Sequence, residues 1–231
     1  GVRPSGSDTR YAPRDCSPHL HTVKLVSDPE GRTPLKVQIP RPLRQDYEGA
    51  WHHVMNRGAG RTPILQSDAD KQLLLDCICA AAQRYCVEIH GYCLMNTHYH
   101  LLLRSTAAQL SDAMRYGSGK FTRIKNMRDG RDGPLFRGRF ASVPIENDAH
   151  LMLVSRYIHL NPVVAGIVAQ AEDWIWSSAS AFLGCGKTPD WLKTALVLDM
   201  VGPQNPIETY RAFLAAGVDR PTGEFYVRMI N

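Results

Sequence analysis

YCLMNTHYHLLL, residues 92–103, places His98 and His100 one residue apart inside an otherwise apolar, strand-like run. In a β-strand, residues i and i+2 point to the same face, with Cα atoms about 6.5–7 Å apart. Two imidazoles so placed can converge on one metal ion. A His-apolar-His pattern also occurs at residues 19–21, in a polar segment. The pattern alone therefore also fits two packed histidines, and its surroundings must decide.

The residues around this run predict alternating strands and helices. VEIHGYCLM and HYHLLLRS flank the short polar turn Asn96-Thr97 and predict a β-hairpin. AWHHVMNRG predicts an earlier strand that ends at a glycine turn. Ser67 or Asp68 is a candidate N-cap for a helix with apolar residues at helical spacing. The remaining predictions are a helix over about 105–127, a glycine-rich basic loop over 128–138, a strand over 139–145 and a helix over about 148–167.

This order of elements predicts a fold class. Strand, helix, strand, strand, helix, strand is the order of a ferredoxin-like α+β sandwich. We expect an antiparallel sheet with helices on one face, plus a small helical C-terminal tail. The corresponding domains are an N-terminal extension over 1–40, partly disordered, a central α+β domain over 41–172, and a tail over 173–231 packed on that domain.

Composition limits the class of protein. The chain has 231 residues, 44% hydrophobic and 21% charged, which is typical of a globular protein. Its apolar runs are shorter than the roughly 18 residues that a membrane helix needs. Six cysteines form no Cys-x-x-Cys pair, which favours buried reduced thiols over disulfides or zinc. We expect a soluble, cytoplasmic protein without a membrane partner.

The positive charge is concentrated in one stretch. Eight basic residues and two aspartates lie between Arg115 and Arg139, so this stretch carries +6 in a chain of net charge +5. Tyr116, Phe121 and Phe136 are interleaved with the basic residues. A charge run is often only a solvated face. Clustering of the whole excess beside aromatic residues instead favours contact with nucleic acid.

A second polar pair lies in SRYIHLNPVVAGIV, residues 155–168. Tyr157 and Asn161 are four residues apart and so share one helix face. A phenol is a poor nucleophile unaided, because its pKa is near 10. Beside a divalent cation that polarises a phosphodiester, it can attack phosphorus, and an amide oxygen can complete the metal shell. The alternatives are a packed aromatic ring and a helix-capping amide before Pro162.

These stretches, with EDWIWSSASAFLG after them, closely resemble the REP-associated tyrosine transposases of the IS200-like, HUH single-strand transposase superfamily. Residues 41–61 and 133–151 resemble further blocks of the family in the same order, so the resemblance covers about residues 41–215. It implies that His98 and His100 bind Mg²⁺ or Mn²⁺, that Asn161 is the third ligand, and that Tyr157 is the nucleophile. It also implies a 5′-phosphotyrosine intermediate with a free 3′-hydroxyl.

The resemblance implies single-stranded DNA with a REP-like hairpin as the partner, a location at the nucleoid, and a monomer or a homodimer. The predicted DNA contacts are Asn56, Arg57, Arg61, Arg123, Arg137 and Arg139. Two features depart from the family pattern: the turn before the histidine pair is Asn96-Thr97 instead of Pro-Asn, and the loop after the first strand has fewer basic residues. Two rival functions stay open, namely a hydrolytic metal-dependent nuclease and a module that binds structured DNA or RNA without cutting it.

Overall fold

The computed structural model describes residues 45–218, which belong to one compact unit. The extension predicted over residues 1–40 lies outside the described residues. Four strands and the helices between them form the first part of the unit: β1 (Ala50–Arg57), α1 (Asp68–Arg84), β2 (Val87–Leu94), β3 (His98–Ser105), α2 (Leu110–Asp129), β4 (Ala141–Ile145) and α3 (Asp148–Val164). A short 3-10 turn, Ala59–Arg61, follows β1.

The strands form one antiparallel sheet in the order β2-β3-β1-β4. With α1 and α2 as the two crossovers, this is the ferredoxin-like arrangement, so the predicted α+β class and antiparallel sheet are confirmed. The hairpin is also confirmed, because the Met95 amide donates to the His98 carbonyl at 2.9 Å across the turn. The register pairs Arg57 at the end of β1 with His98 at the start of β3.

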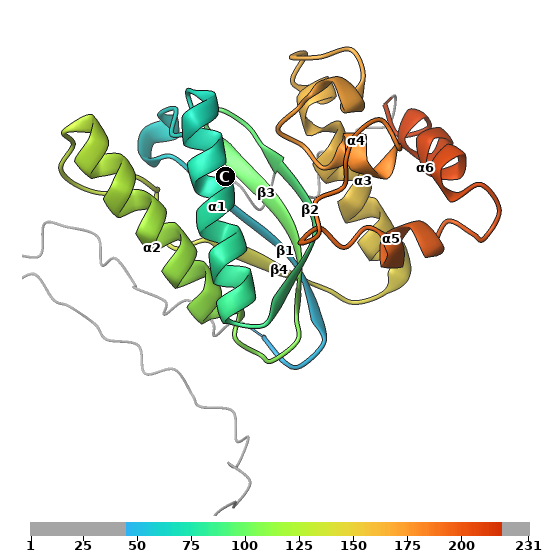
Figure 1. Cartoon of the computed structure of the whole chain (residues 1–231), viewed down its shortest axis with the longest axis horizontal. Helices are drawn as coiled ribbons and strands as arrows, with labels where there is room; N and C mark the ends of the chain where they lie inside the picture. The colour runs from blue at the N-terminus through green and yellow to red at the C-terminus, as the bar shows by residue number, and fades with distance from the viewer. Residues whose placement is uncertain (1–44, 219–231) are drawn as a thin grey trace, which may run out of the picture. The chain divides into compact units, whose positions relative to one another are not determined.

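Helices α1 and α2 cover one face of the sheet, as predicted, and α3 with the C-terminal tail covers the opposite face. Alternate strand residues such as Val54, Leu101 and Leu103 pack in one core with α1 and α2. Leu102 belongs to a second core, formed with α3 and the tail on the opposite face. Figure 1 shows α1 and α2 lying side by side at one side of the molecule and α3 to α6 gathered at the other. The apolar side chains of α3 are buried between the sheet and the C-terminal tail.

Asp70 fixes the start of α1 and ties it to α2. Ser67 accepts from the Asp70 amide, and the Asp70 carboxylate accepts from the Ser67 amide at 3.1 Å, which forms a capping box. The same carboxylate lies 3.1 Å from the ammonium of Lys125 and also contacts Arg128 on α2. Two cations of the basic stretch are therefore structural ion-pair partners.

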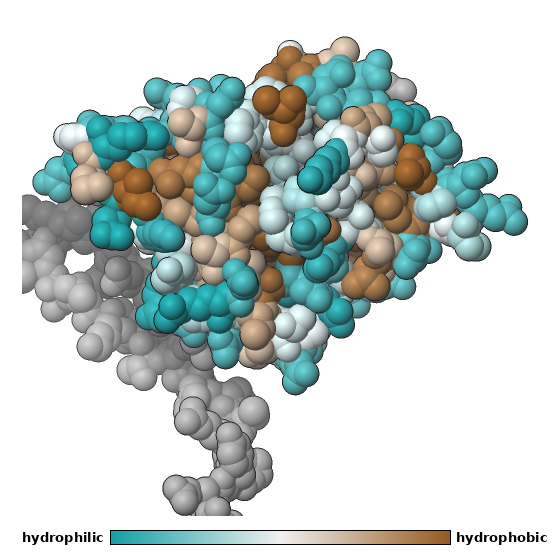
Figure 2. Space-filling view, viewed as in Figure 1, coloured by the Kyte–Doolittle hydropathy of each residue, from teal (hydrophilic) through white to brown (hydrophobic). Residues whose placement is uncertain are grey.

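The C-terminal tail covers the exposed edge of β2. It contains a 3-10 turn (Ala171–Asp173), α4 (Ala179–Phe182), α5 (Ala195–Asp199) and α6 (Pro206–Ala215). Isolated bridges join Ser177 to Cys93 and Leu192 to Ile89, so the edge strand is paired by the tail. Apolar side chains appear in small patches among hydrophilic ones on the face drawn in Figure 2. Within the described part of the chain, none of the helices combines the length and apolarity that crossing a membrane requires.

Candidate active site

His98 and His100 lie on the sheet face that α3 covers, and each presents one ring nitrogen away from the strand. The Nδ1 atom of His98 lies 2.9 Å from the Thr97 hydroxyl, and the Nδ1 atom of His100 lies 3.0 Å from Nε2 of His53. The two ring centroids are 5.1 Å apart. With both Nδ1 atoms engaged, the Nε2 atoms are the ones available to a ligand. The Nε2 atom of His100 is buried and has no hydrogen-bond partner in the described part of the chain.

Sequence reasoning missed His53. Neighbouring residues of a strand point to opposite faces, so His52 and His53 lie on different sides of β1. The His52 ring lies near Asp46 and Ser142. His53 is buried and lies diagonally across from His100, since its direct partner in the register is Leu102. The available signal was the ferredoxin-like strand order, which makes the strands of His53 and His100 neighbours.

Helix α3 brings Tyr157 and Asn161 over the histidines. Asn147 caps the helix by accepting from the His150 amide at 2.9 Å. The Tyr157 ring centroid lies 5.2 Å from that of His100 and 5.7 Å from that of His53, edge-on in both cases. The Oδ1 atom of Asn161 lies 3.5 Å from Nε2 of His98. The structure thus brings together the four residues that the sequence singled out for metal binding and catalysis, although their roles remain a proposal.

Burial controls the charge of this group. It lowers the pKa of His98, an effect that a hydrogen bond with Asn161 opposes and the charge of Arg57 adds to. It also lowers the pKa of His100 well below its ordinary value, helped by the neighbouring rings of His53 and His98. Neutral imidazole is the form that binds metals. Burial raises the pKa of Tyr157, while its hydrogen bond with Asn161 lowers it. The phenol is therefore protonated at neutral pH.

These residues fit a divalent cation. An amide oxygen faces Nε2 of His98, and the His100 ring lies beside the His98 ring. Each Nδ1 atom is held by a second group, as is usual for metal-binding histidines. The Nε2 to Oδ1 separation of 3.5 Å is close to the roughly 3 Å between adjacent ligands of an octahedral ion. Among residues 45–218, no three His, Cys, Asp or Glu side chains come together in a metal-binding group. The third protein ligand would therefore be the amide.

Three of the six predicted DNA contacts lie near the histidines. Arg57 is opposite His98 in the register, and its own carbonyl accepts from the Arg137 amide at 2.9 Å. Burial, followed by the charges of Arg137 and Arg61, lowers the pKa of Arg57. The three guanidinium groups are thus close enough to repel one another. A phosphate backbone would relieve that repulsion.

The other three predicted contacts, Asn56, Arg123 and Arg139, line a pocket of about 720 Å³ on the opposite face, beside α2. Asn56 is already engaged, because its Nδ2 atom donates to the Gly138 carbonyl at 3.3 Å and its Oδ1 atom accepts from the Arg57 amide at 2.9 Å. The structure therefore splits the predicted DNA-binding set between two faces.

Comparison with known proteins identifies the relatives of this chain. The family described as "Transposase IS200 like" matches residues 46–161, half of the chain. A solved structure of a REP-associated tyrosine transposase bound to a REP hairpin is 23% identical, with a TM-score of 0.54, over 67% of this chain and 92% of that one. This likeness supports the fold. A search of curated proteins found no match.

A transposase candidate from Deinococcus radiodurans R1 is 15% identical over 55% of this chain and 97% of that one. Its TM-score of 0.38 is too low to support an argument. The match to the family nevertheless covers β1 through most of α3, and so includes the histidine pair, Tyr157 and Asn161. The chain belongs to the IS200-like transposase family, as its sequence predicted, and is an enzyme of that class.

Proposed function

We propose that this protein is a metal-dependent, single-tyrosine DNA transesterase that nicks and rejoins single-stranded DNA beside a REP-like hairpin. The observation that supports this most is the approach of the Tyr157 ring to the buried His100, with centroids 5.2 Å apart, in a site where an Asn161 oxygen faces His98. A phenol beside side chains that can bind a metal supports a catalytic role, because binding of DNA alone does not require that combination.

The reaction at Tyr157 is a substitution at phosphorus. The phenol oxygen forms a bond to the phosphorus and loses its proton, the bond from phosphorus to the 3′ oxygen breaks, and that oxygen gains a proton. The products are a 5′-phosphotyrosine and a free 3′-hydroxyl. One phosphoester replaces another, so the reverse reaction can rejoin DNA without an external energy source.

His98, His100 and Asn161 would hold the cation, Mg²⁺ or Mn²⁺, since a nitrogen-and-oxygen donor set with room for further oxygen ligands suits these ions. The bound cation would polarise the phosphodiester and lower the energy of the phenolate. The protein supplies positioning: the buried, neutral rings stay fixed by His53 and Thr97. Burial of the Tyr157 side chain limits access of water, which would otherwise compete as the nucleophile.

The substrate class is proposed from two observations. Arg57, Arg61 and Arg137 lie together beside His98, where the phosphates that flank the scissile bond must pass. The solved relative with the same fold is described as bound to a REP hairpin. We therefore propose a hairpin with a single-stranded flank, the flank entering along this arginine cluster.

The test examines the ends of the cut DNA. A labelled REP-like hairpin oligonucleotide is incubated with Mn²⁺ and the wild-type, Tyr157→Phe or Tyr85→Phe protein. Tyr85 is a matched control, because it stacks near Tyr116, away from the histidines. We expect wild type and Tyr85→Phe to release a 3′-hydroxyl end that a polymerase extends, and Tyr157→Phe to release none. Cleavage by Tyr157→Phe would refute the assignment of the nucleophile.

The same experiment separates the rival functions. A hydrolytic nuclease would keep cutting without the phenol and would leave no labelled protein on a denaturing gel. A binding module would hold the hairpin equally well in chelator and after loss of His98 and His100, and would never cut it. The buried His100 Nε2 atom argues against a pure binder, since an unsatisfied buried polar atom lowers stability without aiding DNA contact.

A further inference from the structure

The pocket beside α2 lies on the sheet face opposite Tyr157 and takes no part in the proposed chemistry. Its floor is apolar: Met114, Phe136 and Phe140 are almost fully buried, and their remaining exposed surface lines the pocket. Its walls carry short polar side chains, including Ser118 and Thr122. A volume of about 720 Å³ is in the range of small-ligand sites.

Two cations at this pocket have no acidic partner among residues 45–218. Arg115 forms a 2.7 Å ion pair with Asp112, but no carboxylate in the described part of the chain pairs with Arg123 or Arg139. Both side chains are exposed, and neither has the carboxylate partner that the buried Asp70 provides to Lys125 and Arg128. An apolar aromatic floor beside two unneutralised guanidinium groups suits a ligand with a flat ring and an anionic group.

Gly119 supplies an independent observation that points to a ligand. Glycine in a helix interior costs about 1 kcal/mol relative to alanine. Packing explains Gly117, whose added Cβ would lie 3.2 Å from Ala81 and from the Cys77 carbonyl of α1. It does not explain Gly119, since an added Cβ there meets nothing within 4 Å. Gly119 lines the pocket, so its missing side chain leaves room and exposes helix backbone to whatever enters.

We propose that this pocket binds an unpaired nucleotide of the DNA substrate, with the base against the aromatic floor and a phosphate on Arg123 and Arg139. The inference rests on the proposed function for the class of substrate. Adjacent residues of β1 link the two sites, because Asn56 lines the pocket while Arg57 is paired in the register with His98. A strand that passes around the end of β1 would therefore contact both faces, one for anchoring and one for cleavage.

The experiment measures binding without chemistry. The Tyr157→Phe protein, in chelator, is titrated with a fluorescent hairpin oligonucleotide that has single-stranded flanks, and with a fully paired duplex. Gly119→Phe fills the pocket, and Gly119→Ala is the matched control. Both replacements favour the helix, and thermal melts verify that they fold. We expect Gly119→Phe to weaken hairpin binding about tenfold, as loss of one stacked base would, and Gly119→Ala to change it less than about twofold.

An abasic-site scan identifies the nucleotide. Removal of the base at one position of the flank should weaken binding to the wild-type protein. Removal of the same base should not weaken binding to Gly119→Phe any further. Arg123→Gln should weaken binding and reduce its salt dependence by about one phosphate contact, whereas Arg131→Gln, exposed but outside the pocket, should leave both nearly unchanged.

The proposal that the pocket binds an unpaired nucleotide would be refuted by any of three results. Gly119→Phe could bind the hairpin with unchanged affinity, it could lose equal affinity for the paired duplex, or its effect could add fully to that of every abasic site. These results are independent of cleavage. A pocket that behaves as expected in a protein that never cuts DNA would refute only the proposed function, and cleavage with an inert pocket would refute only this inference.

Discussion

His53 and His100 form a pair in which one ring orients the other. For Nε2 of His100 to offer a lone pair, its Nδ1 atom must carry the proton and donate it to Nε2 of His53, 3.0 Å away. Burial, followed by the nearby His150, lowers the pKa of His53 to about 3, so it stays neutral and able to accept. His53 is thus a positioning residue for the metal site.

This arrangement predicts a graded effect of substitution at His53. His53→Leu removes the acceptor and should weaken Mn²⁺ binding by about 10–100-fold. His53→Gln retains an amide oxygen that can accept from His100, so its loss should be clearly smaller. Isothermal titration calorimetry of the DNA-free proteins measures both. Equal affinity of wild type and His53→Leu would show that His53 does not orient the ligand.

At the residue scale, the sequence predicted the residues whose spacing is local. His98 and His100 alternate on one strand, and Tyr157 and Asn161 share one helix face, so each pair could be recognised by itself. His53 could not, because its contact with His100 depends on the register between two strands 47 residues apart. The ion pairs of Lys125 and Arg128 could not be predicted for a related reason, since their partner Asp70 lies on another helix.

At the scale of elements, one buried carboxylate, that of Asp70, adds ion pairs to the apolar packing between α1 and α2. Burial raises the pKa of Asp70, but hydrogen bonds from the Ser67 backbone, Arg128 and Lys125 outweigh it and lower the pKa to about 2. A carboxyl whose folded pKa lies below its unfolded value of 3.8 stabilises the fold above that value. This stabilisation is lost as the pH falls towards 2.

Replacement of Asp70 should therefore be costly. Asp70→Ala removes the capping box and one of the two carboxylates that pair with buried Lys125, so that only Asp129 remains. This should lower the free energy of unfolding by about 2 kcal/mol or more. Asp112→Ala breaks only the surface pair with Arg115 and should change it by less than about 1 kcal/mol. Urea denaturation at neutral pH compares them. Similar losses for the two variants would contradict this account of the helix contact.

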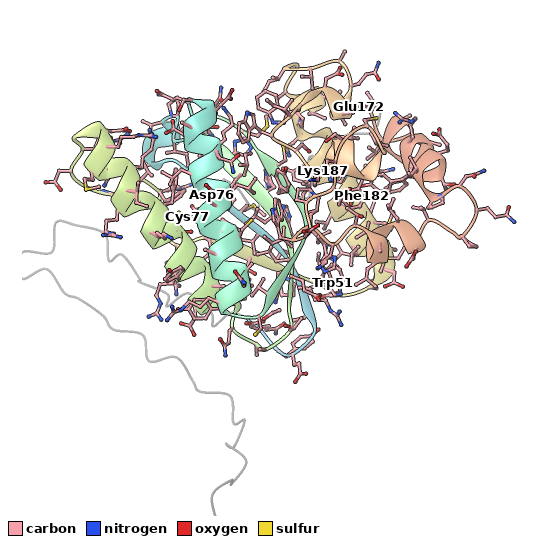
Figure 3. The ribbon with its side chains drawn as sticks, viewed as in Figure 1. Trp51, Asp76, Cys77, Glu172, Phe182 and Lys187 are labelled. Carbon is pink, nitrogen blue, oxygen red and sulfur yellow. The ribbon has the colours of Figure 1, made fainter. Side chains whose placement is uncertain are left out.

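A buried hydrogen-bonded group joins the tyrosine helix to the tail. His159 on α3 has its Nδ1 atom 2.7 Å from the Tyr210 hydroxyl of α6 and its Nε2 atom 2.7 Å from the Ser178 hydroxyl. Its ring packs against Phe182, labelled in Figure 3 among the C-terminal helices, with centroids 4.7 Å apart. These contacts fix the position of the helix that carries Tyr157 relative to the C-terminal tail.

Burial lowers the pKa of His159 to about 3, so acid should destabilise the fold through this residue. Between about pH 6.5 and pH 3 the unfolded chain binds a proton that the folded one does not, and stability falls as the pH falls. The His159 contribution should be about 2 kcal/mol lost between pH 7 and pH 5. Urea denaturation at both pH values should show a shallower pH dependence for His159→Gln than for wild type. Identical pH dependence would mean that the pKa of His159 is the same in the folded and unfolded protein.

Element order was predictable because turns, caps and apolar periodicity are local. The ends of the helices were less predictable. Helix α2 begins at Leu110, later than the predicted residue 105, and α3 ends at Val164, before the predicted residue 167. Which face each helix covers was not predictable from its own residues, since α3 gains apolar cover from a tail that is distant in sequence.

At the scale of the whole molecule, one chain supplies every group of the candidate site. Tyr157 and His100 of the same chain have ring centroids 5.2 Å apart, so cleavage should occur in cis. A mixture of Tyr157→Phe and His98→Ala proteins should therefore cut a labelled hairpin no better than either variant alone. Recovery of a substantial fraction of wild-type activity would instead require exchange of the tyrosine helix between two chains.

The central claim is that the Tyr157 oxygen becomes covalently joined to DNA, and trapping the intermediate tests it most directly. The protein is incubated with Mn²⁺ and a hairpin oligonucleotide labelled on the side 3′ to the cut, then resolved on a denaturing gel, and the labelled band is digested and mapped by mass spectrometry. The account predicts a 5′-phosphonucleotide on the peptide that contains Tyr157, absent in chelator. Efficient cleavage without any labelled protein, or an adduct on another residue, would contradict it.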